Sequence, residues 1–208
     1  MNTNKNKPSP FGGAGGGIVI INYGAGNIKS IQFALQRLGY DAILSYDTKE
    51  IQGADKVIFP GVGEAGTAMT KLRESGLDKL IPTLKQPVLG ICLGMQLMCN
   101  YSKEGNTKGL GIFDVEVVKF KTTLKVPQIG WNQITNLQSN LFNSIREEEY
   151  MYTVHSYYAP LCNETIAATN YGINYSSALQ KDNFYGVQFH PEKSSKAGEQ
   201  LLNNFLEL

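Results

Sequence analysis

The sequence predicts an α/β fold in which helices flank a largely parallel central sheet, with additional β structure in the C-terminal half. From Ile18 onward, short apolar segments alternate with helical segments, which is typical of parallel strands covered by helices. Two apolar segments, residues 57–59 and 88–91, each end in a glycine-rich turn, as central strands with loops at their carboxyl ends do. Beyond Gly111, segments with a β-type pattern dominate.

The elements follow from local patterns, beginning with a strand at residues 18–21. A helix is expected at about residues 27–38, because apolar residues recur there at helical spacing. Asn27 can cap its start and Gly39 can end it.

The later elements are mostly strands, followed by a closing helix. Strands are expected around residues 115–120, 150–155, 166–169 and 186–190, and the helix from about Ser195. Ligands of open α/β sheets bind beyond the carboxyl ends of the strands, so the turns after residues 21, 59 and 91 should share one edge.

Length and composition indicate a single folded domain in this chain of 208 residues. We expect residues 1–17 to form a flexible glycine-rich tail and residues 18–208 to form the folded domain. The net charge of +1 gives no footprint for nucleic acid or a membrane surface, and no apolar run is long enough to span a bilayer. A soluble cytoplasmic protein is therefore expected. The three cysteines lack metal-ligand spacing, so we expect free thiols, no metal and no cofactor.

The strongest chemical signal is the segment Gly90-Ile91-Cys92-Leu93-Gly94. Glycines two residues before and after Cys92 permit a sharp turn from strand into helix that exposes the sulfur. The first turn of the helix beginning at Leu93 would direct partial positive charge at the sulfur and favour the anionic nucleophile. Cys99 is expected two turns along the same helix, in the core.

A base for this nucleophile is expected at His190, one of only two histidines. It follows the apolar segment 187–189, and Pro191 prevents a central strand from continuing. Glu192 could then orient the imidazole and stabilise its protonated form. The other histidine, His155, lies among aromatic residues, where packing or a partner surface is expected rather than catalysis.

Residues 90–96 and 186–192 together resemble the class I (triad) glutamine amidotransferases, with the two motifs about a hundred residues apart in the expected order. Further segments resemble the glutaminase subunits of imidazole glycerol phosphate synthase, from histidine biosynthesis. These segments are residues 22–27, 60–63, 129–132 and 154–157. The likeness extends over residues 18–208 and implies the class I glutaminase architecture, which is flavodoxin-like.

The resemblance implies roles for individual residues. Cys92, His190 and Glu192 would form the triad, and the backbone amides of Val62 and Leu93 would bind the oxyanion. The positions that match glutamine-binding residues are Gly63, Gln96, Glu104, Ser156 and Tyr157. Glu104 would contact the substrate's ammonium group. Gly61 and Gly63 would let the Val62 peptide rotate.

The resemblance also implies a partner, a separate cyclase subunit with a (βα)₈ barrel that receives ammonia. Only sixteen residues follow Glu192, too few for a synthase domain. The partner would contact Asn22, Asn27, Trp131 and Lys193. The substrate would be glutamine, and neither nucleic acid nor membrane is expected as a partner.

Other functions compete with this interpretation. Glutaminase subunits of anthranilate or aminodeoxychorismate synthases usually carry a second glycine where Val62 stands. A non-catalytic scaffold of the same fold should have lost a triad residue, and a cysteine hydrolase acting on peptides would not share Val62, Gln96 and Trp131. Gly24-Ala25-Gly26 resembles the start of a dinucleotide fingerprint, but Lys29 occupies the place of its third glycine.

Overall fold

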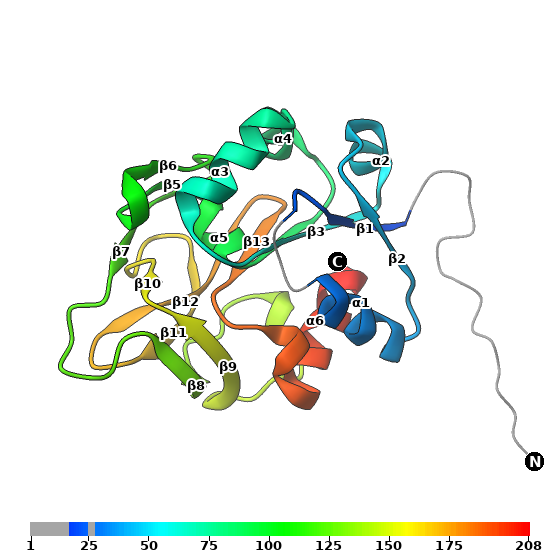
Figure 1. Ribbon diagram of the computed structural model, residues 1–208. Coiled ribbons are helices and arrows are strands. Elements are labelled where there is room, and N and C mark those ends of the chain that lie inside the picture. Colours follow the sequence, from blue (N-terminus) through cyan, green and yellow to red (C-terminus); the bar gives the residue numbers. More distant parts are fainter. Residues whose placement is uncertain (1–16, 25–27) are drawn as a thin grey trace, which may run out of the picture.

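The computed structural model describes residues 17–24 and 28–208 (Figure 1). Of the expected tail, only Gly17 lies within this part, and its carbonyl accepts hydrogen bonds from the amides of Asp55 and Lys56 at 3.0 and 3.3 Å. The expected helix cap Asn27 lies outside the described residues. No helix in the described ranges is long and apolar enough to cross a membrane.

A seven-stranded sheet forms the centre of the molecule, with strand order β11-β12-β13-β4-β3-β1-β2. Its strands are β1 (Ile18–Ile21), β2 (Ala42–Ser45), β3 (Lys56–Gly61), β4 (Val88–Cys92), β11 (Thr165–Asn170), β12 (Asn174–Lys181) and β13 (Phe184–Val187). The five strands from β13 to β2 are parallel, whereas β11, β12 and β13 pair in antiparallel fashion. The predicted largely parallel sheet is confirmed.

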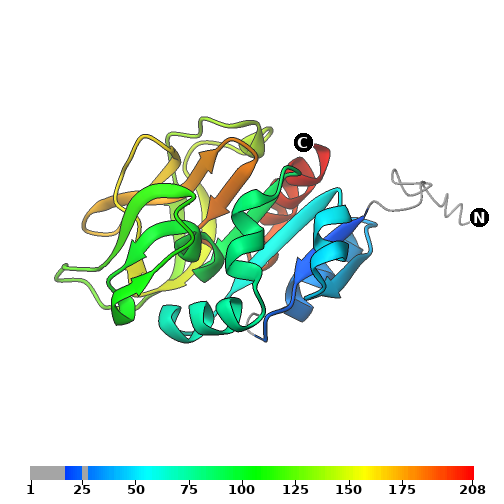
Figure 2. The same cartoon turned by 90° about the horizontal axis from the view of Figure 1, so that it is seen from above.

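Helices cover both faces of this sheet (Figures 1 and 2). One face packs against α1 (Ile28–Arg37) and α6 (Ser195–Glu207), and the other against α2 (Thr48–Gly53), α3 (Ala65–Glu74), α4 (Leu77–Leu80) and α5 (Leu93–Met98). Alternation along the strands supplies both cores, since Val57 and Phe59 face one layer while Ile58 faces the other. The central strands are therefore apolar throughout, as expected for a sheet buried on both sides.

The chain beyond α5 adds two smaller β elements. A four-stranded sheet has the order β10-β7-β5-β6, and β8 pairs with β9 as an antiparallel ribbon. These strands are β5 (Cys99–Ser102), β6 (Thr107–Lys108), β7 (Phe113–Lys119), β8 (Gln128–Ile134), β9 (Glu149–His155) and β10 (Tyr157–Tyr158). The predicted β-rich C-terminal half is confirmed.

The structure confirms the predicted end of the first helix and corrects the predicted position of Cys99. The first helix ends as expected, because Gly39 has a left-handed φ of 88° and its amide bonds to the Gln36 carbonyl at 2.9 Å. Cys99 is buried as predicted, but its placement on the helix was wrong, since α5 ends at Met98 and Cys99 begins β5. The parallel pairing of Cys99 with Phe113 explains the early end, because tertiary strand pairing competes with the helix.

The sheet register brings the predicted site together. Gly61 at the end of β3 lies opposite Cys92 at the end of β4, and β13 pairs Val187 with Ile91. The residues after these strands therefore emerge at one edge, as the parallel arrangement predicted.

Candidate active site

Cys92 occupies a strained turn between β4 and α5. Its φ of 54° and ψ of −111° are rare for a residue with a side chain, and strain of this kind is typical of nucleophile turns. A Cβ at Gly90 would lie 2.9 Å from the Met95 backbone nitrogen, and one at Gly94 would overlap the Phe59 carbonyl. Both positions therefore require glycine, for the steric reason that the sequence suggested.

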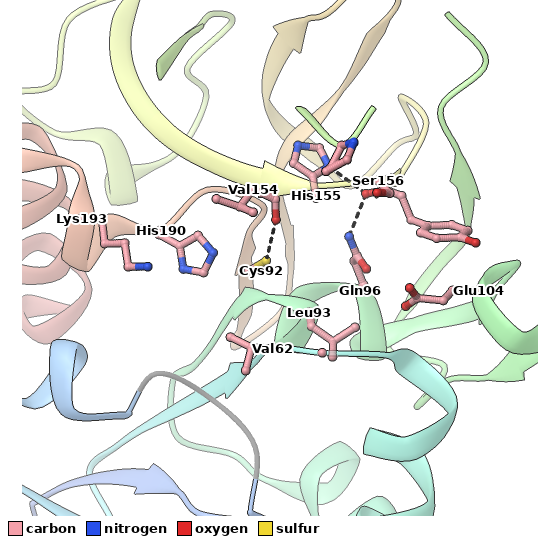
Figure 3. Close-up of a pocket in the computed structure, with 13 residues that line it drawn as sticks. Val62, Cys92, Leu93, Gln96, Glu104, Val154, His155, Ser156, His190 and Lys193 are labelled. Carbon is pink, nitrogen blue, oxygen red and sulfur yellow. Dashed lines mark hydrogen bonds between the residues drawn. The ribbon is translucent and has the colours of Figure 1, made fainter. Parts of the chain in front are cut away.

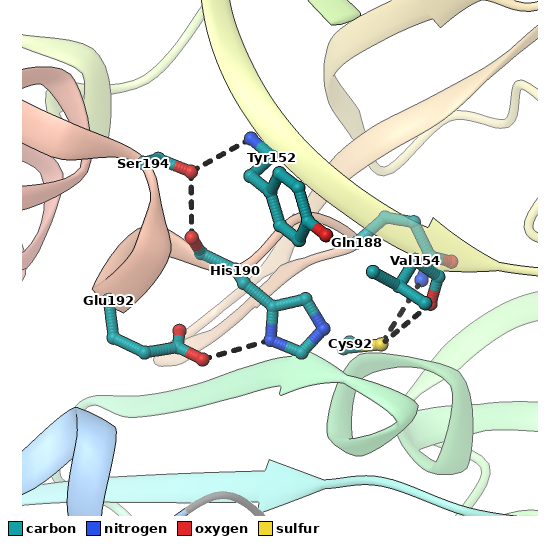
Figure 4. A network of polar contacts seen from close by, with 7 residues as sticks. All are labelled: Cys92, Tyr152, Val154, Gln188, His190, Glu192 and Ser194. Carbon is teal, nitrogen blue, oxygen red and sulfur yellow. Dashed lines mark hydrogen bonds and ion pairs between the residues drawn. The ribbon is translucent and has the colours of Figure 1, made fainter. Parts of the chain in front are cut away.

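His190 leaves the sheet just after β13 and is held by its backbone and its ring. Its amide donates to the Tyr152 carbonyl at 2.8 Å, and its carbonyl accepts from Ser194 Oγ at 2.7 Å. Its ring Nδ1 lies 2.9 Å from Glu192 Oε1, and the Glu192 carboxylate is buried (Figure 4). This bond fixes the ring so that Nε2 is free to face Cys92.

The surroundings of His190 favour its cationic form. Burial alone would disfavour a charged ring, but the Cys92 sulfur and the Glu192 carboxylate outweigh it and raise the pKa of His190 to about 10. A protonated imidazole beside a cysteine suits a thiolate nucleophile, since the pair then consists of opposite charges.

A pocket of about 350 Å³ opens above the sulfur (Figure 3). It brings together most of the predicted site residues, which are Val62, Gly63, Cys92, Leu93, Gln96, Glu104, Ser156, Tyr157, His190 and Lys193. Pro127, Val154 and His155 complete the lining. Glu192 lies behind His190 and does not line the pocket, which fits a residue that acts on the ring.

Gln96 and Glu104 lie on the pocket wall away from His190 (Figure 3). Gln96 Nε2 donates to the Tyr157 carbonyl at 2.8 Å, so its Oε1 remains available as an acceptor. Glu104 Oε2 accepts from the Ala65 amide at 3.0 Å, and burial raises the pKa of this carboxyl. Both groups can accept hydrogen bonds from a ligand's amino group.

The loop around Val62 contains two glycines with different roles. A Cβ on Gly61 would lie 2.5 Å from the Gly94 nitrogen, so Gly61 allows β3 to approach the nucleophile turn. Gly63 has a φ of +93° and open space around it, which makes it the position where conformation requires glycine. Tyr23 anchors the base of the loop, donating from its hydroxyl to the Pro60 carbonyl at 3.1 Å.

Two of the predicted interface residues, Trp131 and Lys193, lie near the same ring, that of Tyr152. Lys193 lines the pocket with its Nζ 6.0 Å from the Tyr152 ring centre, and Asn22 accepts from the Gly24 amide at 3.3 Å. Trp131 lies on β8, 49% exposed, with its ring 5.9 Å from that of Tyr152. Asn27 lies outside the described residues.

His155 is buried, and it packs as its aromatic neighbours suggested. Its Nδ1 lies 2.8 Å from the Tyr157 carbonyl, which can only accept, so this nitrogen carries the proton. Its Nε2 lies 3.3 Å from the Tyr175 hydroxyl, and the ring also packs against Phe120. Burial lowers the pKa of His155 to about 4 and keeps the ring neutral.

The sequence did not single out three residues that support the site. Tyr23 anchors the Val62 loop, and Gln188 contacts the nucleophile. Ser194 Oγ accepts from the Tyr152 amide in β9 and donates to the His190 carbonyl. Gln188 lies inside the segment that carried the family resemblance, so its position between β13 and His190 was the available signal.

The arrangement of Cys92, His190 and Glu192 on an α/β sheet is that of a hydrolase or amidotransferase that uses a cysteine nucleophile with a histidine–carboxylate pair. The comparisons agree. The family model described as glutamine amidotransferase class-I matches residues 19–208. A solved structure described as a glutamine amidotransferase superposes with a TM-score of 0.72 at 18% identity, covering 92% of this chain and 98% of that one.

Two curated relatives are closer in sequence. The chain is 55% identical to imidazole glycerol phosphate synthase subunit HisH of Bacteroides fragilis (strain YCH46) and 49% identical to the HisH subunit of Yersinia pseudotuberculosis serotype I (strain IP32953). Each match covers 92% of this chain and 99% of the relative. The chain belongs to the class I glutamine amidotransferase family and, within it, to the HisH subunits of imidazole glycerol phosphate synthase.

Proposed function

We propose that this chain hydrolyses glutamine and passes the ammonia to a separate cyclase subunit, with which it forms a cytoplasmic heterodimer that makes imidazole glycerol phosphate in histidine biosynthesis. One observation carries the proposal: the pocket above Cys92 is lined by the nucleophile, the base and all five expected glutamine-binding residues. Membership of the HisH subunits supports the choice of synthase, since the relatives are named as subunits. Residues 18–208 would form the amidotransferase domain.

The proposed mechanism begins with attack of the Cys92 thiolate on the carboxamide carbon of glutamine. The carbonyl oxygen becomes an oxyanion, which the backbone amides of Val62 and Leu93 would bind. His190 gives its proton to the departing nitrogen, and ammonia leaves as the carbon–nitrogen bond breaks. A glutamyl thioester remains on the sulfur.

Hydrolysis of the thioester completes the cycle. Neutral His190 would take a proton from water as its oxygen attacks the thioester carbon, and the sulfur leaves as thiolate beside the imidazolium. Glu192 keeps the ring oriented and stabilises its positive charge in both steps, as their 2.9 Å contact allows.

The recognition of glutamine would involve both ends of the molecule. Glu104 and Gln96 Oε1 would accept from the α-ammonium or amide nitrogen, and Gly63, Ser156 and Tyr157 would contact the rest of the substrate. All five lie around one pocket, whose volume of about 350 Å³ accommodates a single amino acid.

The cyclase, a (βα)₈ barrel, would dock on the side of the molecule that carries Trp131. Side chains that alternate along β8 and β9 expose one apolar face, where Ile129, Trp131 and Tyr150 are 59%, 49% and 52% exposed. Such a patch is typical of a protein interface. We also assign Asn22, Asn27 and Lys193 to this interface.

The test is steady-state glutamate release by the chain alone, with the cyclase, and with the cyclase plus its nucleotide ligand. The complex should release glutamate, and Cys92→Ala and His190→Ala should abolish the release while leaving assembly intact. Glu192→Ala should lose less, because orienting a base contributes less than proton transfer itself. Cys162→Ala, at a half-buried thiol outside the pocket, serves as the control and should behave as wild type. Glutamate release by Cys92→Ala would reject the proposal.

A further inference from the structure

Gln188 is a buried polar residue that contacts the nucleophile and that the proposed mechanism leaves unused. Its side chain is fully buried just after the end of β13, and its backbone amide donates to the Ser177 carbonyl at 2.8 Å. Its Nε2 lies 3.8 Å from Cys92 Sγ (Figure 4). Its Oε1 lies 2.9 Å from Gln96 Nε2. One carboxamide thus bridges the nucleophile and a residue of the substrate pocket.

The orientation of this carboxamide follows from a backbone carbonyl. The Tyr157 carbonyl can only accept, so the Gln96 atom 2.8 Å away must be the nitrogen. That nitrogen also contacts Gln188, so the contacting atom of Gln188 must be its oxygen. The nitrogen of Gln188 is therefore the atom that faces the sulfur.

This arrangement distinguishes the two protonation states of the sulfur. A thiol can donate to the Val154 carbonyl, which lies 3.9 Å from Sγ, whereas a thiolate can only accept. Besides His190, Gln188 is the side chain whose polar hydrogen faces the sulfur among the contacts of the described residues. The N–H of Gln188 would bond to the Cys92 thiolate in a buried setting, where hydrogen bonds to charged groups are strong.

Resting on the glutaminase function proposed above, we propose that Gln188 is a positioning residue that holds Cys92 as a thiolate directed at the pocket and, through the same carboxamide, fixes Gln96 with its oxygen toward the substrate. The reactive state of the nucleophile and the acceptor that recognises glutamine are thereby coupled. Loss of the bridge affects both, since it removes a donor from the sulfur and an acceptor from Gln96.

The test compares Gln188→Met, which keeps the length of the side chain but has no N–H, with wild type. Alkylation of Cys92 by iodoacetamide, followed by mass spectrometry of its peptide, needs neither glutamine nor a partner. We expect Gln188→Met to react about tenfold more slowly at pH 7, the effect of one hydrogen bond to a charged group. The difference should narrow as the pH rises, because a higher pH favours the thiolate in both proteins. In complex with the cyclase, the variant should show both a lower kcat and a higher KM for glutamine.

The control is Gln180→Met, a half-buried glutamine on the neighbouring strand β12 that bonds Ser139 and Tyr185. It should alkylate and hydrolyse as wild type does. If Gln188→Met does not fold, Gln188→Glu preserves the shape and places an oxygen against the sulfur, and it should alkylate more slowly still at pH 7. Equal alkylation of wild type and variants across the pH range would overturn the proposal, even with reduced turnover. A wild-type complex without glutaminase activity would instead reject the proposed function and leave the alkylation result to decide the role of Gln188.

Discussion

The chain contains two histidines, and their surroundings shift their pKa values in opposite directions. Burial lowers the pKa of His155 to about 4, while the Cys92 sulfur and the Glu192 carboxylate overcome burial and raise that of His190 to about 10. The ordinary pKa of a histidine is about 6.5. With the shifted pKa values, fewer than one His155 ring in about a thousand is protonated at pH 7.5, and about one His190 ring in three hundred is neutral. Neither ring should titrate between pH 5.5 and 8.5.

NMR of protein labelled with ¹⁵N in its histidine rings measures both states directly. We expect one ring in the imidazolium form and one neutral ring protonated on Nδ1, with signals constant across this pH range. Cys92→Ala should lower the pKa of His190, because it removes the larger of the two stabilising partners, and its signals should begin to move within the range. His155 serves as the internal control. Wild-type signals from either histidine that titrate near pH 6.5 would refute the reasoning.

Three further predictions rest on single positions. The pKa of His155 is lower in the folded than in the unfolded chain, so the unfolded chain binds more protons as the pH falls. The contribution of His155 to the free energy of unfolding is therefore full above about pH 6.5 and falls by about 3 kcal/mol at pH 4. Urea denaturation across this range should show the loss, and His155→Gln should remove this contribution. Gly94→Ala should destabilise the protein by about 3 kcal/mol or more, because the added Cβ would overlap the Phe59 carbonyl. Gly17→Ala is the control, since open space surrounds that position, and equal melting temperatures of the two variants would contradict this prediction. Gly63→Val should reduce activation by the cyclase, because valine is strained at a φ of +93° next to the proposed oxyanion donor. Such a donor is worth about a hundredfold or more in rate, so an unchanged ratio of the rates with and without cyclase would contradict this prediction.

Features that depend on neighbours along the chain could be predicted from the residues alone. Apolar segments that alternate with helical segments predicted a parallel sheet covered by helices. The glycines two residues before and after Cys92 predicted a sharp turn there. His190 and Glu192 lie two residues apart, so their contact needed only a local turn. These are short-range consequences of backbone geometry and periodicity.

Contacts between residues distant in sequence became known only from the folded structure. Gln96 and Gln188 are 92 positions apart, and their bond exists because β4 and β13 pair in parallel. Cys99 leaves the helix because it pairs with Phe113, which helical spacing could not reveal. Glu192 was a local signal for the protonated form of His190, but the pKa shifts of the two histidines also depend on desolvation and on the approach of Cys92 to His190, which are properties of the packed interior.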